Sequence, residues 1–78
     1  MAPLKISLRA ARTNAGLSQE RVAQELRVAK QTVHNWEKGK TEPTVSQAMA
    51  LQELLQISLE HIIFGKKSAE SVFKKEGS

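Results

Sequence analysis

The sequence of 78 residues contains no cysteine, and all eight of its acidic residues are glutamate. Without cysteine, the chain can form neither a disulfide bond nor a thiolate-bound metal site. Its two histidines, His34 and His61, have no cysteine or aspartate with which to complete a metal site. No cluster of residues resembles a catalytic triad either. We therefore expect no metal, no cofactor and no enzymatic activity.

A long apolar run is also absent. Residues 1–16, "MAPLKISLRAARTNAG", resemble neither a signal peptide nor a membrane span, so we expect a soluble cytoplasmic protein. Apolar and polar residues do not alternate over any useful length, so the sequence predicts no β-strand.

Charge is distributed unevenly along the chain, whose net charge is +4. Residues 1–40 hold eight basic side chains against three acidic ones, a net charge of +5. Residues 41–65 hold three glutamates and no basic side chain, and residues 66–78 hold four lysines against two glutamates. This polarity suggests that one face of the protein is turned toward a polyanion.

Apolar residues recur at helical spacing, and turn signals divide the chain into five short helices. The first helix begins between Leu4 and Leu8 and ends near Ala15, before the first glycine. Ser18 is a good N-cap for the second helix. The apolar stripe of that second helix consists of Val22, Ala23 and Leu26.

The third and fourth helices have clear limits. The third covers residues 30–38 and ends at Gly39. Pro43 then breaks the chain, and Thr44 forms a capping box with Gln47 at the start of the fourth helix. The side chains expected to face the core from these two helices are Val33, Trp36, Ala48, Leu51 and Leu55.

A short fifth helix is expected after Ser58, which can cap it, and should stop at Gly65. Its apolar residues are Leu59, Ile62 and Ile63. Residues 66–78 follow as a polar C-terminal tail, which is either disordered or docked on a partner.

Residues 16–44, "GLSQERVAQELRVAKQTVHNWEKGKTEPT", match the helix-turn-helix pattern position by position. The two helices of such a unit cross steeply, so the first needs a small residue at the closest approach, which Ala23 provides. The apolar positions that close the pair are Val22, Leu26, Val28, Val33 and Trp36. Together with "SLEHIIFG" at residues 58–65, this stretch resembles the phage Cro and repressor family, also called lambda-repressor-like or Xre-type domains. The resemblance implies an all-α, compact five-helix domain over residues 1–65.

In that family, the second helix of the motif enters the DNA major groove, and its N-terminal residues contact base edges. The resemblance therefore implies base-reading roles for Lys30, Gln31, His34 and Asn35. Their chemistry agrees, since lysine donates to guanine O6 and N7, while glutamine or asparagine pairs with adenine N6 and N7. His34 could contact a base, a phosphate or only water.

The resemblance also implies contacts with the DNA backbone. Gln19 occupies a phosphate-holding position of the family, and Ser18 and the free amides at that helix end strengthen such a site. Lys38, Lys40 and Thr41 come at or after the end of the third helix and are expected to clamp the backbone.

Two further positions follow from the resemblance. Arg12 and Glu37 match residues that form an internal ion pair in the family, tying the first helix to the end of the third. Arg27 departs from the family, which usually has glycine in this turn because the backbone takes a positive φ. The turn is therefore expected to be either strained or slightly different in geometry.

The function that these features indicate is a sequence-specific regulator of transcription that binds double-stranded DNA, in the manner of a prophage repressor or Cro. We expect a homodimer on a near-palindromic operator, with Leu54, Phe64 and Phe73 as exposed apolar candidates for the dimer contact. A protein antagonist or co-regulator would be the natural effector, because the chain has no room for a ligand-sensing domain. The alternatives are an antitoxin or a restriction-system controller, which use the same domain, and a protein-interaction adaptor.

Overall fold

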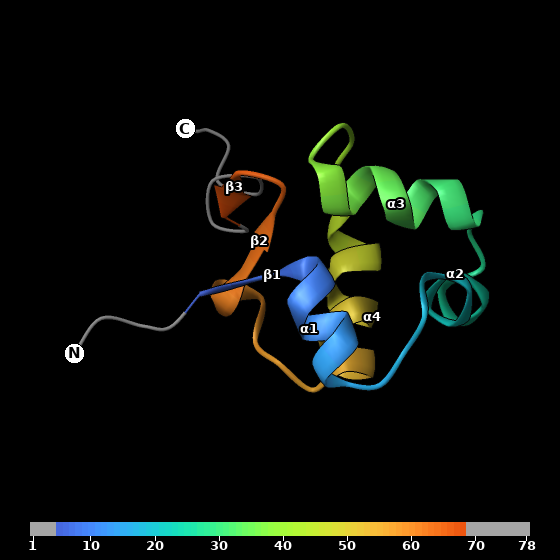
Figure 1. The fold of residues 1–78 in the computed structure, drawn as a ribbon, viewed down its shortest axis with the longest axis horizontal. Helices are drawn as coiled ribbons and strands as arrows, with labels where there is room; N and C mark the ends of the chain where they lie inside the picture. The colour runs from blue at the N-terminus through green and yellow to red at the C-terminus, as the bar shows by residue number, and fades with distance from the viewer. Residues whose placement is uncertain (1–4, 69–78) are drawn as a thin grey trace.

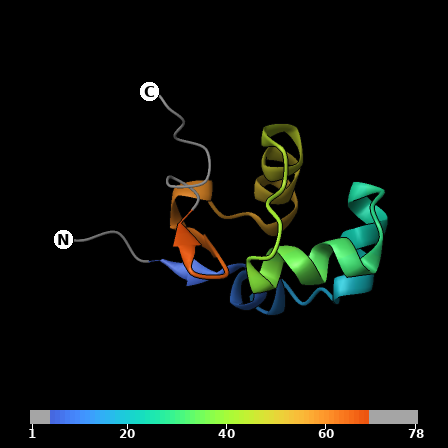
Figure 2. The ribbon, with the colours of Figure 1, turned by 90° about the horizontal axis from the view of Figure 1, so that it is seen from above.

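The computed structural model describes residues 5–68, which form four α-helices and a small three-stranded sheet (Figure 1). The sheet lies at one end of the domain and α2 lies at the other (Figure 2). In chain order the elements are β1 (Ile6–Ser7), α1 (Leu8–Asn14), α2 (Gln19–Leu26), α3 (Lys30–Lys38), α4 (Val45–Leu55), the 3-10 turn η1 (Leu59–His61), β2 (Ile62–Phe64) and β3 (Lys67–Ser68).

The helices α2 and α4 begin where the sequence predicts, and each is capped by a side-chain hydrogen bond. The Oγ of Ser18 accepts a hydrogen bond from the backbone N–H of Arg21 at 3.0 Å. At the start of α4, Thr44 Oγ1 accepts from the N–H of Gln47 at 3.1 Å, and Gln47 Oε1 accepts from the N–H of Thr44 at 2.8 Å. Gly39 ends α3 with a φ of 78°. The predicted starts of α2 and α4 and the predicted limits of α3 are confirmed.

The first helix begins at Leu8, at the late end of the predicted interval. Ser7 is its N-cap, and the Ser7 Oγ accepts from the N–H of Ala10 at 3.0 Å. Ser7 is itself extended and forms β1 together with Ile6, a strand that the sequence did not predict.

The predicted fifth helix is wrong. After Ser58 the chain makes only the single turn η1 and then continues as β2. This strand is central in the sheet: it pairs in parallel with β1, with Ile6 opposite Ile62, and antiparallel with β3. The protein is therefore mostly helical, but it is not all-α.

The error arises from the spacing of Leu59, Ile62 and Ile63, which also fits one face of a helix. In the structure, Ile62 and Phe64 are both 0% exposed while Ile63 between them is half-buried. This is the alternation of a strand, but over three residues it is too short for periodicity to reveal. Isoleucine and phenylalanine favour strands when a partner strand is available.

The core lies between the helices and the inner face of β2. Phe64 belongs to this core, so the expectation that it offers an exposed dimer contact is wrong. Phe64 belongs to the same buried cluster as Val33 and Trp36, which close the helix-turn-helix. The residues of this buried cluster are Leu8, Ala11, Val22, Ala23, Val33, Trp36, Leu51, Leu55, Ile62 and Phe64. Ala48 on α4 is buried as well.

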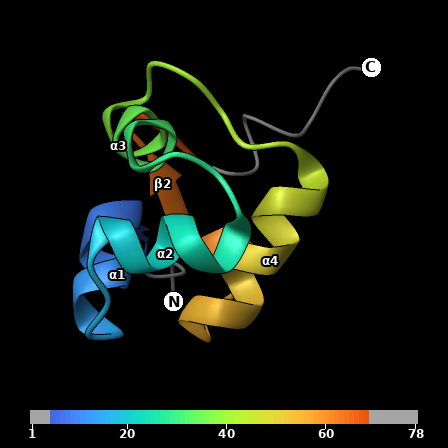
Figure 3. The same ribbon diagram turned by 90° about the vertical axis from the view of Figure 1, so that its right-hand side faces the viewer.

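The helices α2 and α3 cross steeply, as Figure 3 shows with α3 nearly end-on and α2 lying across the view. Ala23 is 4% exposed, which fits the need for a small side chain in this pair. Val33 and Trp36 are buried on the inner side of α3, so the opposite side of α3 faces outward. None of the helices within residues 5–68 is long and apolar enough to cross a membrane.

Candidate nucleic-acid interface

The turn before α3 sets the direction of that helix. Arg27 has φ 60° and ψ 43°, the left-handed conformation in which the family usually has glycine. The N–H of Arg27 donates to the carbonyl oxygen of Gln24 at 3.2 Å, and the N–H of Val28 donates to that of Ala23 at 3.0 Å, closing α2. The turn thus keeps its positive φ despite the Arg27 side chain, so it is strained rather than rearranged.

The outward side of α3 carries the four residues for which the sequence predicts base contacts. Lys30 and Gln31 are exposed, and His34 and Asn35 are half-buried. Gln31 Nε2 donates to Asn35 Oδ1 at 3.0 Å, one helical turn away. A shallow depression of about 240 Å³ is lined by Gln19, Lys30, Gln31 and His34. The structure therefore brings Lys30, Gln31 and His34 together beside the start of α2, and Asn35 joins them through its hydrogen bond with Gln31.

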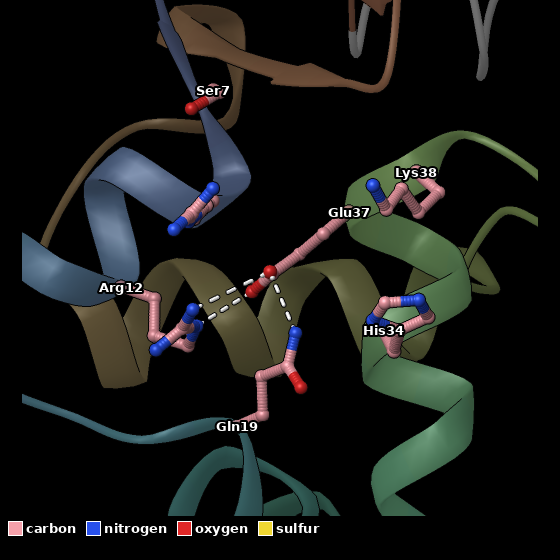
Figure 4. A pocket seen from close by; sticks show the side chains of 7 residues that line it. Ser7, Arg12, Gln19, His34, Glu37 and Lys38 are labelled. Carbon is pink, nitrogen blue, oxygen red and sulfur yellow. Dashed lines mark hydrogen bonds and ion pairs between the residues drawn. The ribbon is translucent and has the colours of Figure 1, made fainter.

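A buried ion pair supports α3 from behind (Figure 4). Arg12 Nε donates to Glu37 Oε2 at 2.6 Å, and Arg12 Nη1 donates to the carbonyl oxygen of Leu17 at 2.9 Å. The two charged side chains are only 13% and 6% exposed. The pair joins α1 to the last turn of α3, where the resemblance placed it.

Gln19 joins this pair, which the sequence did not predict. Its Nε2 donates to Glu37 Oε1 at 2.9 Å, so α1, α2 and α3 meet at one carboxylate. Figure 4 shows the Glu37 side chain extended between Arg12 and Gln19. Both Glu37 oxygens are therefore hydrogen-bonded, and Gln19 keeps its Oε1 and one N–H for another partner.

The remaining polar residues singled out from the sequence lie around these helix ends. Ser18 is exposed at the start of α2 and caps it, while Lys38 is exposed in the last turn of α3. Lys40 and Thr41 are exposed in the segment that follows, where the N–H of Lys40 donates to the carbonyl oxygen of Asn35 at 2.9 Å. This hydrogen bond holds the start of the segment against α3.

A second depression, of about 420 Å³, is lined by two further residues that the sequence did not predict to belong to the site. These are Ser7 and Arg9, at the start of α1, and both are exposed. The only sequence signal for Arg9 is that it precedes Arg12 by three residues, on the same side of a helix. The other lining residues are Arg12, Gln19, His34, Glu37 and Lys38.

The chemistry of the whole surface is that of hydrogen-bonding amides surrounded by positive charge. Its amides and lysines can read base edges, and its cations and hydroxyls can bind phosphate oxygens. Within residues 5–68, no group of three or more histidine or acidic side chains lies close enough together to hold a metal ion.

Comparison with known proteins identifies the fold to which this surface belongs. A family model described as helix-turn-helix matches residues 8–62, more than half of the chain. No curated protein and no solved structure matches the chain at a significant level. The matched segment runs from the first residue of α1 to the first residue of β2 and includes α2, α3 and the strained turn between them. The chain belongs to the Cro and repressor type of helix-turn-helix family, whose domains bind DNA.

Proposed function

We propose that this protein is a sequence-specific regulator of transcription, and that α3 enters the major groove of double-stranded DNA. The observation that carries the proposal is the exposed polar side of α3, backed by the buried side chains of Val33 and Trp36. A helix held this firmly can present base-reading groups at defined positions, which sequence readout requires.

The pairing of Gln31 with Asn35 supports a reading role for both. Because Gln31 Nε2 donates to Asn35 Oδ1, the groups left for DNA include an acceptor, Gln31 Oε1, and a donor, Asn35 Nδ2. Adenine offers the complementary N6–H donor and N7 acceptor in the major groove. Lys30 lies beside them and suits guanine O6 and N7. His34 is the fourth proposed member of this reading surface.

Backbone contacts would hold α3 in register. We assign these to Ser18 and Gln19 at the start of α2 and to Lys38, Lys40 and Thr41 at and after the end of α3. All but Gln19 are exposed, and Gln19 retains free hydrogen-bonding capacity beside Glu37. Such contacts position a protein on DNA without reading its sequence.

Two substitutions separate reading from positioning. Gln31→Ala should cost about 1–3 kcal/mol of binding on the preferred duplex, obtained by selection from random DNA, and little on a scrambled duplex. Lys40→Ala should weaken binding to both duplexes about equally and lower the salt slope by about one unit. If Gln31→Ala weakened both duplexes alike, α3 would not be the reading element.

We further propose a homodimer on a near-palindromic operator. Two-fold symmetry would set two copies of α3 about 34 Å apart, one turn of B-DNA. Sedimentation of the free protein and of its complex with selected DNA tests this, with two copies expected per site. A single copy bound to the best site would contradict it.

The dimer contact is expected in the C-terminal half, because the basic half faces DNA. Leu54 on α4 is half-buried and packs against the core, so it is less exposed than expected for a dimer contact. Phe73 lies outside the described residues. The described part of the C-terminal half also exposes Val45 and Met49, with 60% and 55% of their surface accessible, which the sequence analysis did not single out.

The antitoxin and restriction-controller alternatives would use the same DNA interface and differ in the partner protein. The adaptor alternative differs at the interface itself: it predicts that Gln31→Ala has no selective effect on the preferred duplex.

A further inference from the structure

The larger depression, of about 420 Å³ at the start of α1, carries a net positive charge. Among its described lining residues the one carboxylate is Glu37, which is 6% exposed, and both of its oxygens are hydrogen-bonded by Arg12 and Gln19. The positive charge of Arg12 thus balances the negative charge of Glu37. Two further cations, Arg9 and Lys38, line the depression and are exposed.

No ion pair joins either of these two cations to a glutamate among residues 5–68. Ser7 lies at the same rim (Figure 4). Its Oγ accepts from the N–H of Ala10, so its own O–H remains able to donate. Arg9, Lys38 and Ser7 therefore bring a forked guanidinium, an ammonium and a hydroxyl to one place, a combination suited to phosphate oxygens.

This depression lies next to the proposed reading surface on α3. Gln19 on α2 and His34 on α3 line both depressions, so the two adjoin each other. Lys38 lies one helical turn beyond His34 on the same side. The distance along α3 from Lys30 to Lys38 is about 12 Å at 1.5 Å per residue, which is about the width of the major groove. With α3 lying across the groove and its N-terminal end over base edges, its C-terminal end would lie near the backbone that borders the groove.

We propose that Ser7, Arg9 and Lys38 form a phosphate site, here called the α1–α3 phosphate site, through which α1 contacts the DNA backbone. The inference rests on the proposed function and deepens it, because it adds a contact from a helix outside the helix-turn-helix. The ligand is one phosphodiester of the bound duplex, held at the opposite end of α3 from Lys30 and Gln31.

The test compares Arg9→Gln with Arg21→Gln. Each variant removes one exposed arginine charge, but Arg21 pairs with Glu25 on α2 and lines neither depression. Binding to the selected and scrambled duplexes is measured across a salt series. For Arg9→Gln we expect a several-fold loss of affinity on both duplexes and a salt slope lower by about one unit. Arg21→Gln should keep the wild-type salt slope. Arg9→Lys, which keeps the positive charge, should have a salt slope close to that of the wild type.

Ethylation interference on the selected duplex locates the contact. The wild-type protein should be sensitive to ethylation of one flanking phosphate to which Arg9→Gln is indifferent. Equal salt slopes for Arg9→Gln and Arg21→Gln, or unchanged interference patterns, would overturn the inference. Thermal melting of each variant confirms that the fold is intact.

A free anion is the other source of the same chemistry. Inorganic phosphate is titrated alone, with the backbone amide signals of Ser7 and Arg9 followed by NMR. Tight saturable binding that Arg9→Gln abolishes, combined with a wild-type DNA slope in that variant, would assign the site to a small anion instead. A wild-type protein that binds no duplex at all would refute the proposed function, whereas normal binding unaffected by Arg9→Gln would refute only this site.

Discussion

Gly39 and Gly65 lie backbone against backbone, where the end of α3 meets the turn between β2 and β3. A Cβ atom built on Gly65 would lie 2.5 Å from the Cα of Gly39 and 2.9 Å from the carbonyl oxygen of Lys38. Both glycines also have a positive φ, 78° and 65°. The approach leaves no room for a Cβ atom on Gly65, and a Cβ atom on Gly39 would make a tight contact of 3.0 Å with the Cα of Gly65. It anchors the C-terminal end of α3, and with it the proposed reading surface, to the sheet.

Gly65→Ala should therefore destabilise the fold strongly. The left-handed conformation alone costs an L-residue about 1–2 kcal/mol, and the clash with the Gly39 backbone adds to that cost. Gly16→Ala is the matched control, because Gly16 has φ 76° but a Cβ atom added there would meet nothing within 4 Å. Thermal denaturation of the two variants isolates the backbone approach. Equal losses of melting temperature would show that the end of α3 can move away from Gly65 at no cost.

Glu37→Gln should lower the melting temperature substantially. The change leaves the buried Arg12 guanidinium without a counter-charge, and breaking a buried ion pair typically costs about 3–5 kcal/mol. Glu25→Gln serves as the control, because its partner Arg21 is 59% exposed and Glu25 is 41% exposed. An exposed pair of this kind contributes less than about 1 kcal/mol. A melting temperature that Glu37→Gln leaves unchanged would show that the pair contributes nothing to stability.

Arg27→Gly should stabilise the fold by several tenths of a kcal/mol. Glycine removes the cost of the left-handed conformation, on the order of 1 kcal/mol, but loses part of that gain to the greater freedom of the unfolded chain. Gln24→Gly, at an exposed interior position of α2, should have the opposite sign and destabilise by about 1 kcal/mol. Urea denaturation of both variants gives the comparison. Destabilisation by Arg27→Gly would mean that the Arg27 side chain makes a contribution larger than the strain.

Much of the helical framework could be predicted because its signals are local. Ser18, Thr44 with Gln47, and Gly39 each satisfy backbone groups within a few residues of themselves. The inward positions of α2 to α4 follow equally from helical spacing. The outward side of α3 is then determined as the complement of its buried side, so the grouping of Lys30, Gln31, His34 and Asn35 on one surface required no tertiary information.

The tertiary structure decided what depends on residues far apart in the chain. β2 is a strand because β1, near the other end of the chain, lies beside it and pairs Ile6 with Ile62; alone, three residues carry no usable period. Phe64 is buried for the same reason.

The proposed phosphate site has the same origin. Arg9 becomes a neighbour of Lys38 only when α1 packs against the end of α3. Gln19 meets Glu37 only when α2 packs against α3. Caps and helical periodicity act over a few residues and can be read in sequence, whereas these contacts exist only once hydrophobic burial has brought separate helices together.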